Sequence, residues 1–256
     1  MDERRLDRDL RFAHRLADLA AEVTMARFGE RLPVETKADG TQVTPADREV
    51  EGILRREIAR TFPGDGIHGE EGGLDPGSRD RLWIIDPVDG TALFALGIPL
   101  WSTLIALRQE GVIVVGVADV PTLGQRYHAA LGAGAWRNDR PLHVSRVSRL
   151  SEATVLYAGD GRMEPSTLRV TERARMARAL SDAWGQLLIA QGSAEALLEH
   201  PPCFEWDWAA PSLIVSEAGG RVTTRSGTAP EPGCDLLVSN GLVHHEILAA
   251  TAASEA

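Results

Sequence analysis

Apolar residues recur every three or four positions between residues 6 and 28, and again between residues 50 and 58. This spacing predicts two amphipathic helices, and a glycine directly after the first run suits its end. Thr44 and Pro45 open the second helix, because Thr is a favoured N-cap and Pro fits the first helical turn. The polar stretch between the helices, residues 35–41, is typical of two strand ends around a turn.

The pattern becomes extended after the second helix. Residues 82–85 form a short apolar run, and two longer β-rich runs, 100–108 and 112–119, are separated by a Gln-Glu-Gly hairpin signal. Shorter runs continue the pattern at 125–128 and 134–137, followed by an Asn-Asp turn. Up to about residue 145 the chain is therefore expected to form two helices and then an antiparallel sheet.

The second half of the chain alternates between strand and helix patterns. Strands are predicted at 155–157 and 236–238, and helices at 166–180, 186–198, 207–218 and from Asn240, as cap, to Ala250. Such βαβ-like spacing without a flexible linker favours two packed layered subdomains. We place them at residues 1–148, with two helices on an antiparallel sheet, and 149–256, an α/β unit.

Composition and charge narrow the function classes. Of the 256 residues, 37 are acidic and 27 basic, which gives a formal net charge of −10. This balance argues against nucleic acid as a partner, because phosphate backbones bind basic faces. The chain has no apolar stretch long enough to span a membrane and its first residues do not resemble a signal peptide, so we expect a cytoplasmic protein. An acidic chain that handles a phosphate would need metal cations to reverse the local charge.

One acidic motif, DPVDGT at residues 86–91, has the character of a metal site. Asp86 and Asp89 follow an apolar strand and stand three residues apart around Pro87, which we expect to form a rigid turn. Together with the Val88 carbonyl they offer hard oxygen ligands of the kind that Mg²⁺ prefers. The backbone N–H groups after Asp89 could meet an anion. An ordinary strand and turn with two solvated aspartates is the alternative.

Three further acidic residues have structural explanations as well as functional ones. Glu70 belongs to a glycine-flanked HGEEGG segment, where acids are usually solvated. Asp207, in the segment WDWAA, opens a predicted helix and could act only as its cap. Asp47 lies three residues after the N-cap Thr44, where a carboxylate favours the helix dipole.

The two motifs together are more specific than either alone. DPVDGT and, about 120 residues later, WDWAA followed by EAGG resemble the paired signatures of the inositol monophosphatase superfamily. The resemblance extends over most of the chain, from the opening helix to residues 240–245. It implies a layered α/β/α/β/α sandwich of the α+β class, and a lithium-sensitive, Mg²⁺-dependent phosphomonoesterase that is commonly a homodimer.

The resemblance also assigns roles residue by residue. By similarity, two or three Mg²⁺ ions would be held by Glu70, Asp86, the Val88 carbonyl, Asp89 and Asp207. Glu70 would orient the attacking water, and Thr91 with Asp47 would activate it. The backbone N–H groups of Gly90 and Thr91 would hold the phosphate of a small phosphomonoester.

The match extends to a branch of the superfamily, the histidinol-phosphate phosphatases of the high-GC Gram-positive type. Segments that resemble this branch include DLRFAH at residues 9–14, GDG at 64–66 and SNGL at 239–242. Arg178 and Asp182 align with an Arg and an Asp of the branch, but the residues between them differ. The loop at residues 159–162 does not match either. The half of the site that cleaves phosphate is thus intact, whereas the half that binds the alcohol is altered.

Departures from the family concern the rim and the alcohol side. Ala92 and Leu93 stand where many relatives have Lys and, one residue later, Asn. His200 stands seven residues before Asp207, where relatives usually have a Glu that contacts substrate hydroxyl or amine groups. A one-residue slip would let Glu199 take that role. His244 and His245 are expected at the surface rather than as metal ligands, because no spacing links them to the acidic clusters.

Histidinol phosphate is therefore the leading substrate, with an inositol, sugar or nucleoside monophosphate as alternatives. A 3′,5′-bisphosphate nucleotidase would need a second basic pocket, which Arg162, Arg169, Arg173 and Arg178 could supply, although a solvated basic helix face is the simpler interpretation. A non-catalytic metal- or ligand-binding relative is the alternative of another class. The retention of all four carboxylates, Glu70, Asp86, Asp89 and Asp207, argues against it.

Overall fold

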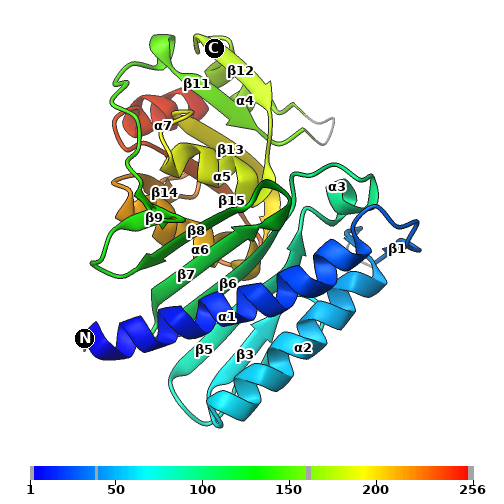
Figure 1. The fold of residues 1–256 in the computed structure, drawn as a ribbon. Coiled ribbons are helices and arrows are strands. Elements are labelled where there is room, and N and C mark those ends of the chain that lie inside the picture. The colour runs from blue at the N-terminus through cyan, green and yellow to red at the C-terminus, as the bar shows by residue number, and fades with distance from the viewer. Residues whose placement is uncertain (1–2, 38–39, 160–162, 253–256) are drawn as a thin grey trace.

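The computed structural model describes residues 3–37, 40–159 and 163–252. Helices and sheets alternate in five layers (Figure 1). The helices α1 and α2 cover one face of a sheet of eight strands, and α5 and α6 lie between that sheet and a second one of five strands. The helices α4 and α7 cover the outer face of the second sheet. The predicted αβαβα sandwich is confirmed.

The N-terminal elements match the sequence pattern closely. Helix α1 spans Glu3–Arg27 and α2 spans Pro45–Thr61, with Thr44 as N-cap. Between them, β1 (Glu35–Thr36) and β2 (Gln42–Val43) pair antiparallel, as the polar stretch predicted.

The first sheet has the strand order β10-β9-β8-β7-β6-β5-β3-β4, antiparallel except for the parallel pair β3 and β5. Its strands are β3 (Gly66–Gly69), β4 (Gly73–Asp75), β5 (Arg81–Asp89), β6 (Ser102–Gln109), β7 (Val112–Val120), β8 (Gln125–Ala130), β9 (Ala135–Arg137) and β10 (Arg140–Pro141). Short helices α3 (Thr91–Ala95) and η1 (Pro121–Leu123) connect some of them. The predicted hairpin between β6 and β7 is confirmed.

One local prediction in this region is wrong. Pro87 does not form a turn, because β5 continues to Asp89 and its pairing with β6 shifts register between Asp86 and Asp89. Proline lacks a backbone N–H and is therefore tolerated where the ladder of a sheet is interrupted. The Pro87 carbonyl still accepts a hydrogen bond from Thr103 Oγ1 at 2.8 Å. The irregularity thus separates two aspartates without ending the strand.

The second sheet has the order β12-β11-β13-β15-β14, with β11 parallel to both neighbours and β15 antiparallel to both of its own. Its strands are β11 (Thr154–Tyr157), β12 (Met176–Ala179), β13 (Ala196–Cys203), β14 (Arg221–Thr223) and β15 (Cys234–Ser239). The helices of this half are η2 (Leu150–Glu152), α4 (Pro165–Thr171), α5 (Asp182–Ala190), α6 (Glu205–Glu217) and α7 (His244–Ala252).

Two helices predicted in this half are wrong in part. The segment 166–180 forms only the short α4 before the chain returns as the edge strand β12. The segment 186–198 is divided between α5 and β13, and Gly192 lies between them with a φ of 75° that favours glycine. Both faces of β13 are buried around residues 196–198, so its strand pattern lacks the usual polar alternation.

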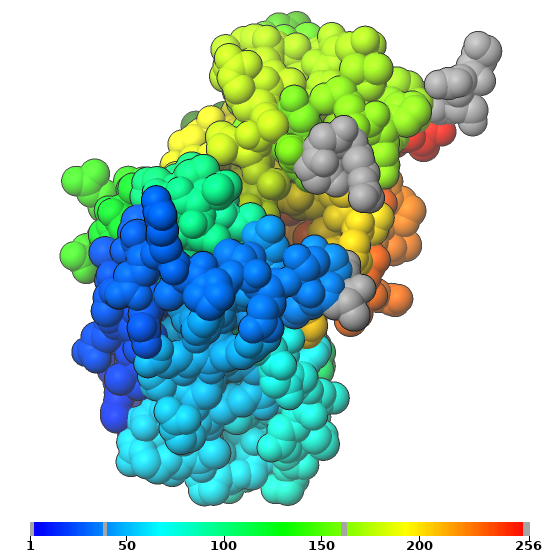
Figure 2. Space-filling view, turned by 90° about the vertical axis from the view of Figure 1, so that its right-hand side faces the viewer, coloured from blue at the N-terminus to red at the C-terminus, as the bar shows by residue number. Residues whose placement is uncertain are grey.

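The core explains the layers. Trp83 and Ile85 of β5 pack under α1 and α2, whereas the alternate residues Leu82 and Ile84 face α5 and α6. The cluster that contains α5 and α6 joins side chains from both sheets. Figure 2 shows the N-terminal half, in blue to cyan, meeting the C-terminal half, in yellow to orange, on one face of the molecule. The division into subdomains at residue 148 stays a prediction.

Candidate active site

A cavity of about 530 Å³ draws its lining from both halves of the chain. Most of the candidate site residues line it: Glu70, Asp86, Val88, Asp89, Gly90, Thr91, Asp182, Glu199, His200 and Asp207. Ala92 and Leu93, the two departures after Thr91, also lie in its wall. The tertiary structure therefore brings together both acidic motifs, which are far apart in the sequence.

The β5 motif supplies the floor of the cavity. Asp86 Oδ1 accepts a hydrogen bond from the Val88 backbone N–H at 3.0 Å. Asp89 Oδ2 accepts one from Ser102 Oγ at 2.9 Å, and the Ala183 N–H approaches both Asp89 oxygens at 3.3 Å. These local contacts orient both carboxylates. Sequence reasoning did not single out Ser102, which lies opposite Asp89 in the β5–β6 ladder.

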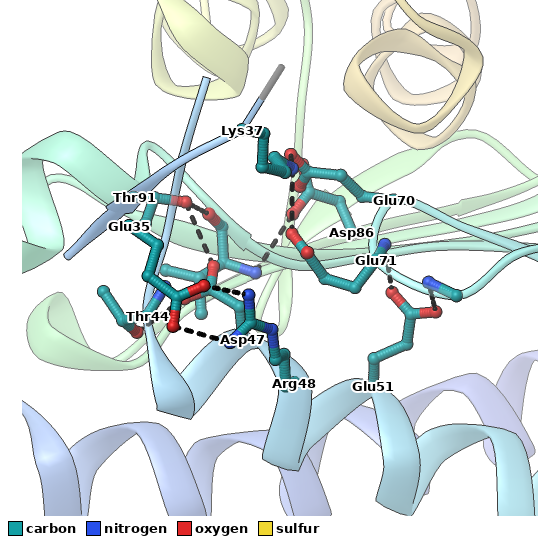
Figure 3. A network of polar contacts seen from close by, with 12 residues as sticks. Glu35, Lys37, Thr44, Asp47, Arg48, Glu51, Glu70, Glu71, Asp86 and Thr91 are labelled. Atoms are coloured by element: carbon teal, nitrogen blue, oxygen red, sulfur yellow. Dashed lines mark hydrogen bonds and ion pairs between the residues drawn. The ribbon is translucent and has the colours of Figure 1, made fainter. Parts of the chain in front are cut away.

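Thr91 and Asp47 meet beside this floor (Figure 3). The Thr91 hydroxyl lies 3.0 Å from Asp47 Oδ1 and 2.9 Å from the Val88 carbonyl oxygen, and it can donate to either. The other Asp47 oxygen accepts from the Thr44 backbone N–H at 2.8 Å and from the Thr44 hydroxyl at 2.6 Å. Asp47 therefore completes the capping box of α2 and is also a partner of Thr91, so its two interpretations do not exclude each other. Burial raises the pKa of Asp47 against the opposing effect of these hydrogen bonds.

Glu70 is engaged by a lysine that sequence reasoning did not select. Lys37 Nζ lies 2.6 Å from Glu70 Oε1 and 3.0 Å from Glu71 Oε1 (Figure 3). Burial raises the pKa of Glu70 to about 6, although Lys37 opposes the shift. Burial disfavours the charged form of Lys37, but its two glutamate partners raise its pKa above the usual value. A possible signal was its place in the polar stretch between the first two helices.

The loop that carries Glu70 is anchored from α2. Glu51 accepts hydrogen bonds from the backbone N–H groups of Glu71 and Gly72, both at 2.7 Å. The Glu51 side chain also pairs with Arg55, and Glu51 is almost fully buried. A Cβ at Gly69 would lie 2.4 Å from Glu51 Oε1, so any larger residue there would displace the Glu51 carboxylate.

Asp207 reaches the cavity from the first turn of α6. Its Oδ2 accepts a hydrogen bond from the Phe204 backbone N–H at 2.6 Å, so the side chain caps the helix as well as lining the cavity. Burial raises the pKa of Asp207 to about 7, and the charges of Glu70 and Asp182 add to the shift. Gln186 of α5 holds the Asp207 carbonyl at 3.0 Å.

The donor set fits a hard divalent cation. Burial first, and then repulsion from the neighbouring carboxylates, raises the pKa of Asp86 and of Asp89 well above the usual value. Carboxylate and carbonyl oxygens are the ligands of Mg²⁺, and its charge would offset this repulsion. Within residues 3–37, 40–159 and 163–252, no three His, Cys, Asp or Glu side chains converge closely enough to hold a metal in the arrangement described, in which Lys37 engages Glu70.

The part of the cavity wall that the resemblance assigns to the substrate alcohol is acidic too. Glu199 is 8% exposed, and its Oε1 has no hydrogen-bond partner among the described residues. Burial, followed by the charges of Asp182 and Asp89, raises its pKa well above the usual value. His200 Nδ1 lies 3.4 Å from Glu164 Oε1 and 3.4 Å from an Arg225 nitrogen. Both candidates for the family's glutamate position, Glu199 and His200, therefore line the cavity.

Four arginines were predicted to bind the substrate or a second phosphate. The three that the structure describes lie outside the cavity wall. Arg178 is exposed on β12, does not line the cavity and donates to the Ala177 carbonyl oxygen at 2.8 Å. Arg169 donates to the carbonyl oxygens of Ala250 and Thr251 at the end of α7, and Arg173 pairs with Glu246. Arg162, together with Asp160 and Gly161 of the unmatched loop, lies outside the described residues.

The histidine pair near the C-terminus differs from expectation. His245 is exposed as predicted, but His244 is fully buried at the start of α7. Thr223 Oγ1 donates to the Thr224 carbonyl, so it accepts from His244 Nε2 at 3.0 Å. His244 Nδ1 then accepts from Ser239 Oγ at 2.8 Å. The ring is satisfied as a neutral tautomer away from the cavity, so the surface prediction for His244 is wrong.

Comparison with known proteins agrees with this geometry. The model of the inositol monophosphatase family matches residues 5–256, and the chain belongs to that family. The predicted resemblance is thereby confirmed. Among the residues described, no helix is both long and apolar enough to cross a membrane.

Individual relatives refine the comparison. The chain is 41% identical to a histidinol-phosphatase of Mycobacterium tuberculosis, over 94% of this chain and 96% of the relative. It is 40% identical to a histidinol-phosphatase of Streptomyces coelicolor, over 94% and 95% respectively. A solved structure, the Thermotoga maritima IMPase, superposes with a TM-score of 0.86 at 32% identity, over 95% of this chain and 96% of that one.

These relatives confirm two expectations. The resemblance to the histidinol-phosphatase branch is confirmed, and so is the expectation of an enzyme that is a phosphoric monoester hydrolase. The inositol monophosphatase family acts on small phosphomonoesters with the help of metal ions.

Proposed function

We propose that this chain is a Mg²⁺-dependent phosphomonoesterase that hydrolyses a small polar alcohol phosphate, with histidinol phosphate as its leading substrate. One observation carries the proposal. Glu70, Asp86, Asp89 and Asp207 line a single cavity together with Thr91, which is hydrogen-bonded to Asp47.

In this proposal the metal is held by Glu70, Asp86, the Val88 carbonyl, Asp89 and Asp207, as two or three Mg²⁺ ions per site. Bound Mg²⁺ would supply positive charge at the phosphate and acidify the attacking water. Lys37 competes for Glu70 in the arrangement described, because its ammonium lies 2.6 Å from Glu70 Oε1. Glu70 must therefore exchange this contact for the metal.

The chain's own residues then position the water and the phosphate. The Thr91 hydroxyl can donate to Asp47 and accept a hydrogen bond from the water, so that Asp47 takes up the proton through Thr91. The pKa of Asp47, raised by burial, favours this uptake. Backbone N–H groups of Gly90 and Thr91, at the start of α3, bind the phosphate oxygens.

The acidic alcohol side supports an amino alcohol as the leaving group. Glu199 Oε1 is buried without a hydrogen-bond partner among the described residues, and Asp182 lies in the same cavity wall. A buried carboxylate is stabilised most by a cationic partner. The amine of histidinol phosphate is such a partner, whereas the uncharged hydroxyls of an inositol or sugar phosphate are not.

A homodimer, which the resemblance implies, and a cytoplasmic location, which the sequence pattern predicts, remain predictions. A phosphatase for inositol, sugar or nucleoside monophosphates remains the alternative. The three described arginines offered for a second phosphate lie outside the cavity wall, which disfavours a bisphosphate substrate. The retained carboxylate set disfavours a non-catalytic relative.

The deciding experiment is phosphate release with Mg²⁺ from histidinol phosphate, inositol 1-phosphate, adenosine monophosphate and adenosine 3′,5′-bisphosphate. We expect histidinol phosphate to give the highest kcat/KM. Asp89→Asn keeps an oxygen for Ser102 but removes the charge, and should lower kcat at least about 100-fold. Asp119→Asn is the matched control, because Asp119 is equally buried but pairs with Arg126 outside this cavity.

Three results would contradict the proposal or part of it. Full activity of Asp89→Asn would show that Asp89 is not a ligand of an essential metal ion. Equal rates on all four substrates would remove the amino-alcohol preference. A folded protein that binds Mg²⁺ but releases no phosphate from any of them would favour the non-catalytic alternative.

A further inference from the structure

Three polar side chains that the proposed function does not use bridge α6 to the first sheet. Glu205, the first residue of α6, places Oε2 3.3 Å from His68 Nδ1. Its other oxygen, Oε1, is paired with Arg108 of β6. The Glu205 residue is 5% exposed, whereas the side chains of His68 and Arg108 are 21% and 36% exposed.

The bridge crosses the strand that carries the aspartate motif. In the first sheet β5 lies between β6 and β3. Arg108 is opposite Leu82 of β5 on one side, and His68 is opposite Ile84 on the other. The Glu205 carboxylate therefore straddles β5, with one oxygen directed to each neighbouring strand.

Aromatic packing holds the same junction. The His68 ring meets Trp206 edge-on, with centroids 5.0 Å apart and planes at 77°. Trp206 in turn stacks on Phe204 at 5.0 Å. Glu205 stands between these two residues in the sequence, and the contact of Trp206 with His68 joins the start of α6 to β3.

Two residues of the bridge, His68 and Glu205, each lie two positions before a candidate metal ligand. Glu70 follows His68 at the end of β3, and Asp207 follows Glu205 in the first turn of α6. These two carboxylates face one cavity and repel each other, so they remain close only if their backbones are held. Glu205, which does not line the cavity, links the backbone segments that carry these two carboxylates.

We propose that Glu205 is a positioning residue that, through His68 and Arg108, fixes the spacing between Glu70 and Asp207. The inference rests on the proposed metal site. It predicts that the bridge acts on metal affinity, because a ligand set with the wrong spacing binds Mg²⁺ more weakly even when every ligand is present.

The test compares Glu205→Gln and Arg108→Gln with the wild type and with Asp119→Asn. Glu205→Gln keeps the shape of the side chain and removes its charge. Arg108→Gln removes one of the two partners of Glu205, and the Arg108 side chain is itself 36% exposed. Asp119→Asn breaks another buried ion pair, that with Arg126, away from the cavity. Mg²⁺ binding is measured by calorimetry without substrate, beside the Mg²⁺ dependence of phosphate release and the Tm.

We expect Glu205→Gln to bind Mg²⁺ about tenfold more weakly and to need correspondingly more Mg²⁺ for half-maximal phosphate release. Arg108→Gln should shift both quantities in the same direction by less. Asp119→Asn should lower the Tm without changing Mg²⁺ affinity. If Glu205→Gln fails to fold, Arg108→Gln carries the test.

The outcomes separate this proposal from the proposed function. Unchanged Mg²⁺ affinity in the folded bridge variants overturns the positioning role, whatever the wild-type activity. A wild type that binds Mg²⁺ but releases no phosphate overturns the proposed function, and the calorimetric comparison still decides the bridge. A wild type that binds no Mg²⁺ overturns both.

Discussion

The two sides of the cavity are built in different ways. On the phosphate side Asp86 is held by the Val88 N–H close in sequence, Asp89 by Ser102 across one ladder, and Glu70 by Lys37. On the alcohol side Glu199 Oε1 has no such partner among the described residues. The first side is preorganised by the protein, whereas the second leaves a buried carboxyl oxygen for the substrate to pair. We infer that catalysis and specificity can change independently here.

The largest effect that would test the phosphate side concerns Thr91. Thr91→Ala removes the hydroxyl that links Asp47 to the cavity and should lower kcat about 100-fold. Helix α2 should remain capped, because Asp47 Oδ2 keeps its contacts with Thr44. Thr91→Ser restores the hydroxyl and should recover most of the rate. A kcat for Thr91→Ala equal to that of the wild type would contradict the proposed role.

A smaller and more selective effect is expected on the alcohol side. Glu199→Gln should raise KM for histidinol phosphate about tenfold, because the buried charge no longer pairs with the amine. KM for inositol 1-phosphate, which lacks the amine, should change little.

His200→Gln is the matched control for Glu199. If His200→Gln, rather than Glu199→Gln, changes KM selectively for histidinol phosphate, then the family's glutamate role has passed to His200. In that case the comparison between the two sides holds, but its key residue is wrong.

The smallest effect lies outside both sides, in the outer layer of the second sheet. Burial lowers the pKa of His244 to about 4, and nearby Arg221 and His245 add to the shift. The unfolded ring accepts a proton near pH 6.5, whereas the folded ring stays neutral, so stability is present above pH 6.5 and falls as the pH drops towards 4. The contribution lost is at most about 3 kcal/mol.

Thermal unfolding between pH 7.5 and pH 4.5 measures this contribution. The Tm of the wild type should fall more steeply with acid than that of His244→Gln. Parallel curves for the two proteins would show that His244 does not govern the acid sensitivity.

Local signals in the sequence were sufficient for the elements whose ends are marked by caps and turns. Thr44, Pro45 and the spacing that follows predicted α2, and Gln109-Glu110-Gly111 predicted the β6–β7 hairpin. One error falls where a short apolar run is buried on both faces. Residues 196–198 lack the alternation that distinguishes a strand, so the pattern alone assigned them to a helix.

The sequence by itself predicted most of the residues of the proposed phosphate side, because two short motifs place carboxylates, a carbonyl and a hydroxyl within a few residues of one another. It also determined the family, which the comparisons bear out. Only the tertiary structure decided which residues meet across long distances in the chain. Three features depend on how two sheets pack around α6: the contact of Lys37 with Glu70, that of His68 with Glu205, and the position of Glu199, whose Oε1 has no hydrogen-bond partner among the described residues. Packing is a property of the whole core, and no local spacing encodes it.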